Sequence, residues 1–122
     1  MTYKRKDDWG KWRDTPAGMW YGFVVNNRRR KRHEVEMNRD EFIKWYTHQP
    51  KECYYCGIKL EDIPNMKVVK TKRLTIDRRD NDGPYSISNI VLACFRCNMV
   101  KGFVFSEEEM LEIAQKYLIG RL

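Results

Sequence analysis

Apolar and polar residues alternate with helical spacing in the first half of the chain. Residues 19–25 are apolar and lead into a run of basic residues, and together they predict a helix over 19–32. Its positive end complements the helix dipole. A second amphipathic pattern predicts a helix over 39–48, because its aromatic residues recur at i, i+3 and i+4. The polar residues 1–18 show no such period and are expected to form an arm.

The second half of the chain predicts two short strands and two further helices. The stretch Met66–Asp77 is rich in Val, Thr, Leu and Ile, and alternation over its last residues, 73–77, predicts a half-buried strand. The apolar run Asn89–Ala93 predicts a more buried strand beyond a turn. A helix over Phe95–Lys101 is expected to end at Gly102. The last helix, over 107–119, is predicted to bury one apolar face. That face consists of Met110, Leu111, Ala114, Tyr117 and Leu118.

Composition narrows the class of protein. With 122 residues, of which 42% are hydrophobic, the chain is long enough for one small domain with a thin core. Lys and Arg outnumber Asp and Glu by 24 to 17, and this excess favours polyanionic partners such as nucleic acid. The apolar stretches are too short for a membrane helix, and no apolar segment follows the basic start. We therefore expect an intracellular protein.

Four cysteines fall into two pairs with the same spacing. Cys53 pairs with Cys56 and Cys94 with Cys97, and two residues between thiols allow both sulfurs to hold one ion. Two disulfides or four unrelated thiols are the alternatives, and a reducing compartment argues against disulfides. The paired spacing predicts a closed site of four thiolates around a structural Zn²⁺, which adds folding free energy to a chain with a thin core.

Three further features accompany the cysteine pairs. An Asp ends the first predicted strand, an Asn opens the second, and the second cysteine pair continues as Cys-Asn-x-x-Lys-Gly; these are Asp77, Asn89 and residues 97–102. Together with both cysteine pairs they resemble the HNH endonucleases of the zinc-knuckle, phage-like kind, over residues 53–102. The resemblance implies an α+β fold: a ββα-metal module with a four-cysteine zinc site, flanked by helices. It also implies hydrolysis of phosphodiester bonds in DNA.

The resemblance assigns roles to four polar residues. Asp77 and Asn98 would hold a catalytic Mg²⁺ or Mn²⁺, and hard oxygen ligands suit those ions as soft thiolates suit zinc. Asn89 would pin the hairpin through hydrogen bonds without touching the ion. Lys101, one helical turn beyond Asn98, would meet a phosphate. Taken singly each is an ordinary structural residue, and only their spacing relative to the cysteines favours these roles.

The chain departs from the family directly after the strand-ending Asp. The family has a His there as its base, whereas this chain has Arg78, which stays protonated and can only clamp a phosphate or stabilise the transition state. Three explanations remain open. In an Asp-Arg-x-Asp variant, Asp80 ligates the metal or activates the water; alternatively His33, His48 or Tyr85 supplies the base; or the site only binds. The intact remainder of the motif favours the first.

Basic residues form two groups that are predicted to contact DNA phosphates. One is a run of five charges on the first predicted helix, and the other lies beside the candidate site. Such contacts position a protein on DNA and carry little sequence information. The predicted contacts are Arg28, Arg29, Arg30, Lys31 and Arg32 in the run, and Lys72, Arg73, Arg79 and Lys101 beside the site.

The predicted organisation is one domain in two parts. Residues 1–50 form the basic arm and helices, and residues 51–122 form the zinc-stapled nuclease module with its C-terminal helix. The predicted function is a metal-dependent DNA endonuclease. The alternative is a non-cleaving zinc module that binds nucleic acid through a degenerate site, which the Arg at the usual His position favours. A protein-interaction module would leave the basic run unexplained.

Overall fold

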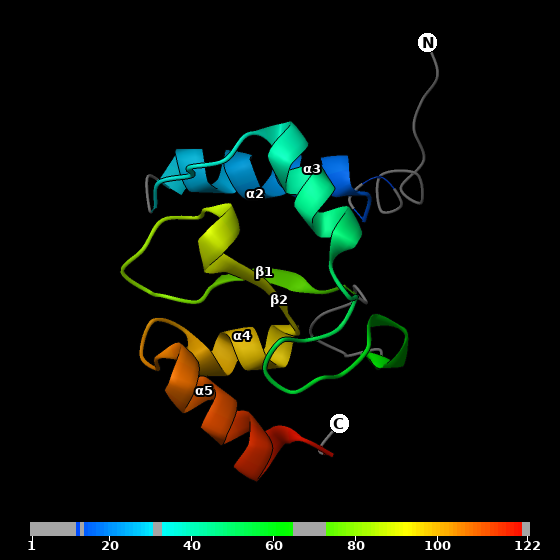
Figure 1. The fold of residues 1–122 in the computed structure, drawn as a ribbon, viewed down its shortest axis with the longest axis vertical. Helices are drawn as coiled ribbons and strands as arrows, with labels where there is room; N and C mark the ends of the chain where they lie inside the picture. Colours follow the sequence, from blue (N-terminus) through cyan, green and yellow to red (C-terminus); the bar gives the residue numbers. More distant parts are fainter. Residues whose placement is uncertain (1–11, 13, 31–32, 65–72, 121–122) are drawn as a thin grey trace. The chain divides into compact units, whose positions relative to one another are not determined.

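The fold consists of two compact units that are interleaved in sequence. The computed structural model describes residues 12, 14–30, 33–64 and 73–120 (Figure 1). The first unit is Met1–Gln49 with Pro84–Ile87, and the second is Pro50–Gly83 with Ser88–Leu122. Among the described helices, none has both the length and the apolar run that crossing a lipid bilayer requires.

The first helix, α2, spans Pro16–Arg30 and begins earlier than the sequence pattern indicates. The Thr15 hydroxyl accepts a hydrogen bond from the Gly18 amide at 3.1 Å, which is an N-terminal cap. Pro16 fits the first helical position because no backbone N–H is needed there. The expected arm over residues 1–18 was therefore wrong for its last three residues, while residues 1–11 and 13 lie outside the described chain.

The second helix, α3, spans Arg39–His48 and confirms the predicted bounds. It begins with a reciprocal capping box: the Glu41 amide donates to Asn38 Oδ1 at 2.8 Å, and the Asn38 amide donates to Glu41 Oε1 at 3.0 Å. This satisfies two backbone donors that the first turn of a helix otherwise leaves unpaired.

An aromatic cluster joins α2 and α3 into the core of the first unit. Phe42 of α3 is completely buried, with its ring centroid 5.6 Å from Trp20 and 6.3 Å from Phe23, both on α2. Tyr85 packs edge-on against Phe23 at 4.4 Å, and its backbone pairs with that of Glu34 and Glu36. Tilted and edge-on pairs of this kind add to the free energy of burial. Trp20 is half-buried and packs against the core residue Phe42.

A two-stranded antiparallel sheet lies in the second unit. β1 spans Thr75–Arg78 and β2 spans Ile90–Ala93, with Thr75 opposite Ala93 and Arg78 opposite Ile90. Both predicted strands are confirmed: β1 begins two residues after the expected alternation and ends one residue later, and β2 begins one residue later than expected. A 3₁₀ turn over Ile87–Asn89 precedes β2, and another over Leu60–Asp62 follows the first cysteine pair.

The helix α4 follows β2 directly and spans Phe95–Lys101, as predicted. Gly102 ends it with φ of 50°, a left-handed value that glycine adopts without strain. Figure 1 shows α4 running along the β1–β2 hairpin, with α5 after it. Two antiparallel strands followed by a helix confirm the expected α+β class.

The last helix changes its winding part-way along. α5 spans Glu107–Ile113, and the chain continues as a π-helical turn over Ala114–Leu118 in which the Ile119 amide donates to the Ala114 carbonyl. The wider turn rotates the side chains that follow. Met110 and Ala114 are buried as expected, but Tyr117 is 57% exposed, so its predicted place in the apolar face was wrong.

Candidate active site

The four cysteines converge in the second unit. All four Sγ atoms lie within 4.8 Å of one another, and Cys56 Sγ is 3.7 Å from Cys94 Sγ. A disulfide requires a separation of about 2.05 Å. Four sulfurs each about 2.3 Å from one ion are instead separated by nearly 4 Å. The cluster therefore fits one tetrahedral metal ion.

Backbone amides support the sulfurs at both turns. The Cys97 amide donates to Cys94 Sγ at 3.4 Å, and the Cys56 amide points at Cys53 Sγ at 3.5 Å. Donors of this kind offset negative charge on thiolates. Cys94 also caps α4, so the metal cluster and the start of that helix share residues.

Asp77 lies in the third position of β1 with its side chain turned inward. It is only 6% exposed, and its Oδ2 accepts a hydrogen bond from the Tyr55 hydroxyl at 2.5 Å and lies 3.3 Å from Lys101 Nζ. Burial raises the pKa of this carboxyl, while the Tyr55 hydrogen bond and the Lys101 charge oppose the rise. A buried carboxylate with two fixed partners has a defined orientation.

Sequence reasoning missed Tyr55. It lies inside the first cysteine pair, is buried, and reaches Asp77 across 22 positions of sequence. Burial and the neighbouring carboxylate raise the pKa of its hydroxyl, so the hydroxyl keeps its proton and remains a hydrogen-bond donor to Asp77 at neutral pH. The one signal was its position between two metal-binding cysteines, which fixes its backbone but does not say where its hydroxyl points.

Asn98 is the middle residue of α4 and directly follows Cys97. Its amide nitrogen donates to Thr75 Oγ1 at 2.8 Å, and that hydroxyl donates to the Ala93 carbonyl at 2.8 Å. Since the nitrogen is used toward β1, the carbonyl oxygen is the atom that can ligate a hard cation. Asp77 and Asn98 thus belong to facing elements, since α4 contacts β1.

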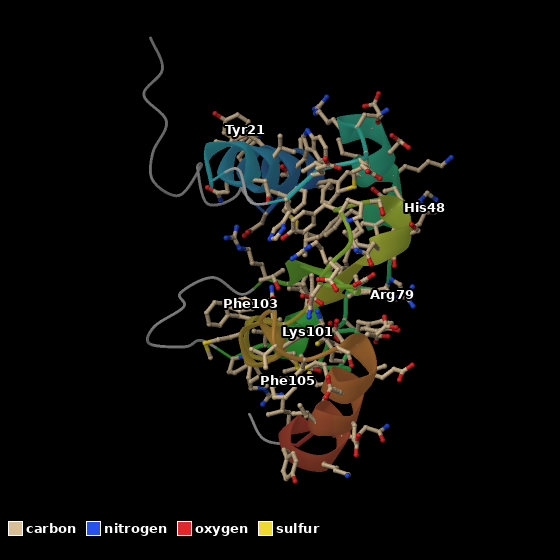
Figure 2. All side chains as sticks on the ribbon, turned by 90° about the vertical axis from the view of Figure 1, so that its left-hand side faces the viewer. Tyr21, His48, Arg79, Lys101, Phe103 and Phe105 are labelled. Atoms are coloured by element: carbon tan, nitrogen blue, oxygen red, sulfur yellow. The ribbon has the colours of Figure 1, made fainter. Side chains whose placement is uncertain are left out.

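Lys101 is placed differently from the expectation. Its side chain is 0% exposed, and Figure 2 shows it between the strands and α4. Its Nζ donates to the Arg78 carbonyl at 2.8 Å and to Asn81 Oδ1 at 2.6 Å. The predicted phosphate contact is contradicted by this placement, because a fully enclosed ammonium has no access to a DNA backbone.

The turn between the strands is fixed by side chains at both ends. The Asn89 side chain accepts from the Asp80 amide at 2.9 Å and donates to the Asp80 carbonyl at 3.1 Å. Arg78 Nη1 donates to the carbonyls of Asn81 and Gly83, each at 2.7 Å. A Cβ on Gly83 would lie 2.8 Å from Asn89 Nδ2, so a side chain there would displace Asn89 from its hydrogen bonds to Asp80.

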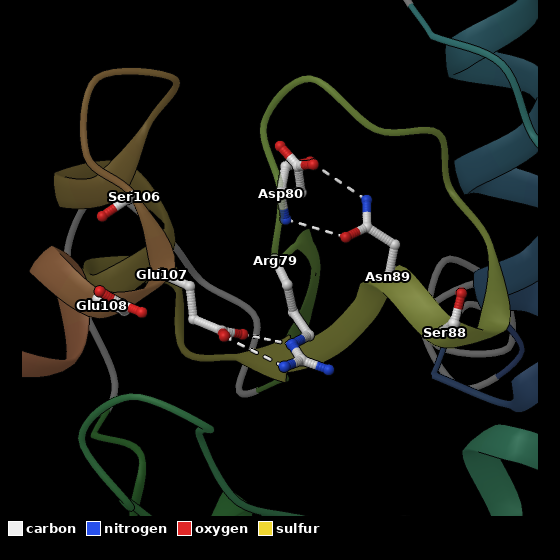
Figure 3. A pocket seen from close by; sticks show the side chains of 7 residues that line it. All are labelled: Arg79, Asp80, Ser88, Asn89, Ser106, Glu107 and Glu108. Atoms are coloured by element: carbon white, nitrogen blue, oxygen red, sulfur yellow. Dashed lines mark hydrogen bonds and ion pairs between the residues drawn. The ribbon is translucent and has the colours of Figure 1, made fainter.

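A pocket of about 480 Å³ opens beside this turn (Figure 3). Arg79 forms a two-point ion pair with Glu107 of α5, and this pair lowers the pKa of Glu107. The Asp80 carboxylate is exposed here, and its Oδ1 accepts from the Asp82 amide at 2.9 Å. The lining is Arg79, Asp80, Ser88, Asn89, Ser106, Glu107 and Glu108.

The other candidate bases lie in the first unit. His33 packs against the Tyr85 ring with centroids 5.8 Å apart, and His48 Nδ1 is 2.7 Å from the Lys44 carbonyl of its own helix. His33 and Tyr85 are thus close to one another, and the His48 ring contacts the backbone of its own helix, α3.

Few of the predicted phosphate contacts have described side chains. Arg28–Arg30 form the end of α2, although only their backbone is described, and Lys31, Arg32 and Lys72 lie outside the described residues. Arg73 precedes β1 and is half-buried. Arg79 is exposed and paired with Glu107.

The chemistry of the site follows from its donor set. Within the described ranges, the four cysteines are the one group of three or more His, Cys, Asp or Glu side chains placed to share a metal. Asp77 and Asn98 offer two oxygen ligands. That number suits Mg²⁺, which usually keeps several waters and binds through one or two protein oxygens plus substrate phosphates.

Comparisons with known proteins agree with this geometry. Residues 53–103 match the family described as HNH endonuclease. The fold is similar to that of the rare-cutting HNH restriction endonuclease PacI, whose structure is described as showing an extraordinary mechanism of DNA perturbation. That similarity has a TM-score of 0.70 and 27% sequence identity, and it covers 83% of this chain and 75% of PacI. No curated protein matches the chain significantly.

Proposed function

We propose that this chain, which carries an HNH endonuclease domain at residues 53–103, is a metal-dependent DNA endonuclease. The observation that carries the proposal is the buried Asp77 of β1, facing a helix whose Asn98 directly follows a metal-binding cysteine. The similarity to a DNA-cutting HNH enzyme over most of the chain supports DNA as the substrate.

Two metals with different roles fit these residues. The four cysteines would hold a structural Zn²⁺, since a closed set of four thiolates leaves no position for substrate. Asp77 and Asn98 would hold Mg²⁺ or Mn²⁺, which when bound supplies Lewis acidity to a phosphate oxygen. The protein's own contribution is to fix both ligands from a strand and a helix.

The residues after Asp77 complete the proposed site. Asn89 holds the backbone of Asp80, and the Asp80 carboxylate is exposed where water can reach it. We assign Asp80 as the group that binds the ion or accepts a proton from the attacking water. Arg78, with Nη1 occupied by two turn carbonyls, holds the turn in the unbound protein.

Substitution of the candidate bases one at a time tests this assignment. Asp80→Ala is expected to lower the cleavage rate about 10²-fold or more, the usual contribution of a general base, while His33→Ala, His48→Ala and Tyr85→Phe stay within about threefold of wild type. Initial rates on a labelled duplex with Mn²⁺ provide the measurement. A loss confined to one of the other three variants would move the base to that residue.

Duplex binding should depend steeply on salt because of the basic run. The slope of log K against log[salt] is negative, and replacing Arg28, Arg29 and Arg30 with Gln should make it shallower by about 2.7, since each lost phosphate contact removes about 0.9. Lys116→Gln is the control, because Lys116 pairs with Glu112 on the exposed side of the C-terminal helix. Fluorescence anisotropy across a salt series gives the slope for each variant. Equal slopes in the two variants would show that the basic run does not contact DNA.

A non-cleaving binding module is the second candidate, and Arg78 at the usual His position is the observation that favours it. Binding and cutting measured on one duplex separate the two. The endonuclease forms a shifted complex without added Mg²⁺ or Mn²⁺ and cut strands once either ion is added. A shifted complex that stays intact with both ions, across duplexes of varied sequence, favours the binding module.

A further inference from the structure

Lys101 is a fully buried cation in the middle of the proposed site. Its Nζ lies 2.8 Å from the Arg78 carbonyl, 2.6 Å from Asn81 Oδ1 and 3.3 Å from Asp77 Oδ2. An ammonium removed from water is costly unless oxygen atoms compensate it. Three acceptors do so here, and all belong to β1 or the turn that follows it.

Lys101 links the C-terminal end of α4 to the turn that follows β1. Asn81 accepts from Lys101 through Oδ1 and donates through Nδ2 to the Phe105 carbonyl at 2.9 Å. The turn is therefore tied to the C-terminal end of α4 at Lys101 and to the segment after Gly102. Asn98 lies one turn earlier on the same helix.

We propose that Lys101 is a positioning residue that fixes the Asp77 carboxylate and the turn over residues 78–83 relative to Asn98. The inference rests on the proposed nuclease function, because it assigns Lys101 a task in that site. Lys101 connects the two metal-ligand candidates: it extends from the helix of one and contacts the carboxylate of the other. Displacing a catalytic group by about 1 Å can cost about 10²-fold in rate.

Lys101→Met tests the proposal, since methionine has a similar length and volume but no donor. The cleavage rate at saturating DNA should fall about 10²-fold or more. Duplex affinity and its salt slope should stay unchanged, because a buried Lys101 does not contact phosphate. Amide hydrogen exchange should accelerate about tenfold or more at Arg79, Asp80 and Gly83, whose amides bond within the turn and to Asn89.

Met110→Ala is the matched control. Met110 is also 0% exposed in the second unit, but it lies on α5 and carries no polar atom of the site. Both variants are compared with wild type as zinc-loaded protein, at a temperature where circular dichroism shows all three folded. Met110→Ala should retain turn protection and lose less than about threefold in rate, because Met110 lies on α5 and its side chain makes no hydrogen bond to the turn.

The outcomes separate this inference from the proposed function. If wild type cuts no DNA, the proposed nuclease function is overturned. If only Lys101→Met accelerates hydrogen exchange in the turn, Lys101 still holds the turn in place. A salt slope lowered by about 0.9 in Lys101→Met, with turn protection intact, identifies a phosphate contact and overturns the positioning role. Equal exchange in Lys101→Met and Met110→Ala overturns it as well.

Discussion

Asp77→Asn should lower the rate of DNA cleavage by about 10³-fold or more while leaving the fold intact. The variant keeps the shape of the side chain and can still accept from Tyr55, but it removes the anionic ligand of the catalytic ion. Lewis-acid stabilisation by such an ion is worth several kcal/mol, and each 1.36 kcal/mol is about tenfold in rate. Single-turnover cleavage with Mn²⁺ at saturating enzyme gives the rate.

Asp82→Asn is the matched control for charge. Asp82 lies in the turn that follows β1, is exposed, and contacts Asp80 through its backbone amide. Removing its carboxylate changes the net charge by the same amount and should change the rate less than about threefold, since a screened surface charge contributes little. Equal losses in both variants would show that the charge of the turn matters and that Asp77 has no special role.

Cys97→Ser is expected to unfold the second unit at room temperature. Cys97 is 0% exposed, and its sulfur belongs to the cluster that joins the turn of Cys53 and Cys56 to α4. Structural zinc contributes about 10 kcal/mol or more to small domains, which exceeds the total stability of many of them. Far-ultraviolet circular dichroism and bound zinc per chain measure the loss.

Phe103→Ser provides the comparison for that variant. Phe103 is 86% exposed in the same unit, so replacing it removes a large side chain that buries little surface. It should retain one zinc per chain and unfold within a few degrees of wild type. If Cys97→Ser also retained cooperative unfolding at the wild-type temperature, the four-cysteine cluster would not be a structural metal site.

The sequence predicted those parts of the fold that local chemistry dictates. Capping residues and side-chain periodicity fixed α3, and the cysteine spacing with Gly102 fixed α4. The start of α2 was missed because the apolar run begins after the Thr-Pro signal that caps the helix. The π-helical turn after Ile113 was missed because apolar periodicity assumes uniform winding.

The candidate site shows the same division. Asp77, Asn89 and Asn98 could be proposed from the sequence because they stand at fixed offsets from strand ends and cysteines. The contacts of Tyr55 with Asp77 and of Lys101 with Arg78 were not predicted, since they join residues 22 and 23 positions apart and no local pattern encodes them. A lysine followed by glycine at a helix end resembles an exposed phosphate contact until the packing of β1 against α4 is known.

The decisive measurement is cleavage of supercoiled plasmid by zinc-loaded wild type and by the Asp77→Ala variant. An active site built on Asp77 should give nicked or linear plasmid from wild type with Mg²⁺ or Mn²⁺, and intact plasmid both without added ion and with Asp77→Ala. Plasmid cut equally by wild type and Asp77→Ala, or cut without added divalent ion, would contradict an active site built on Asp77.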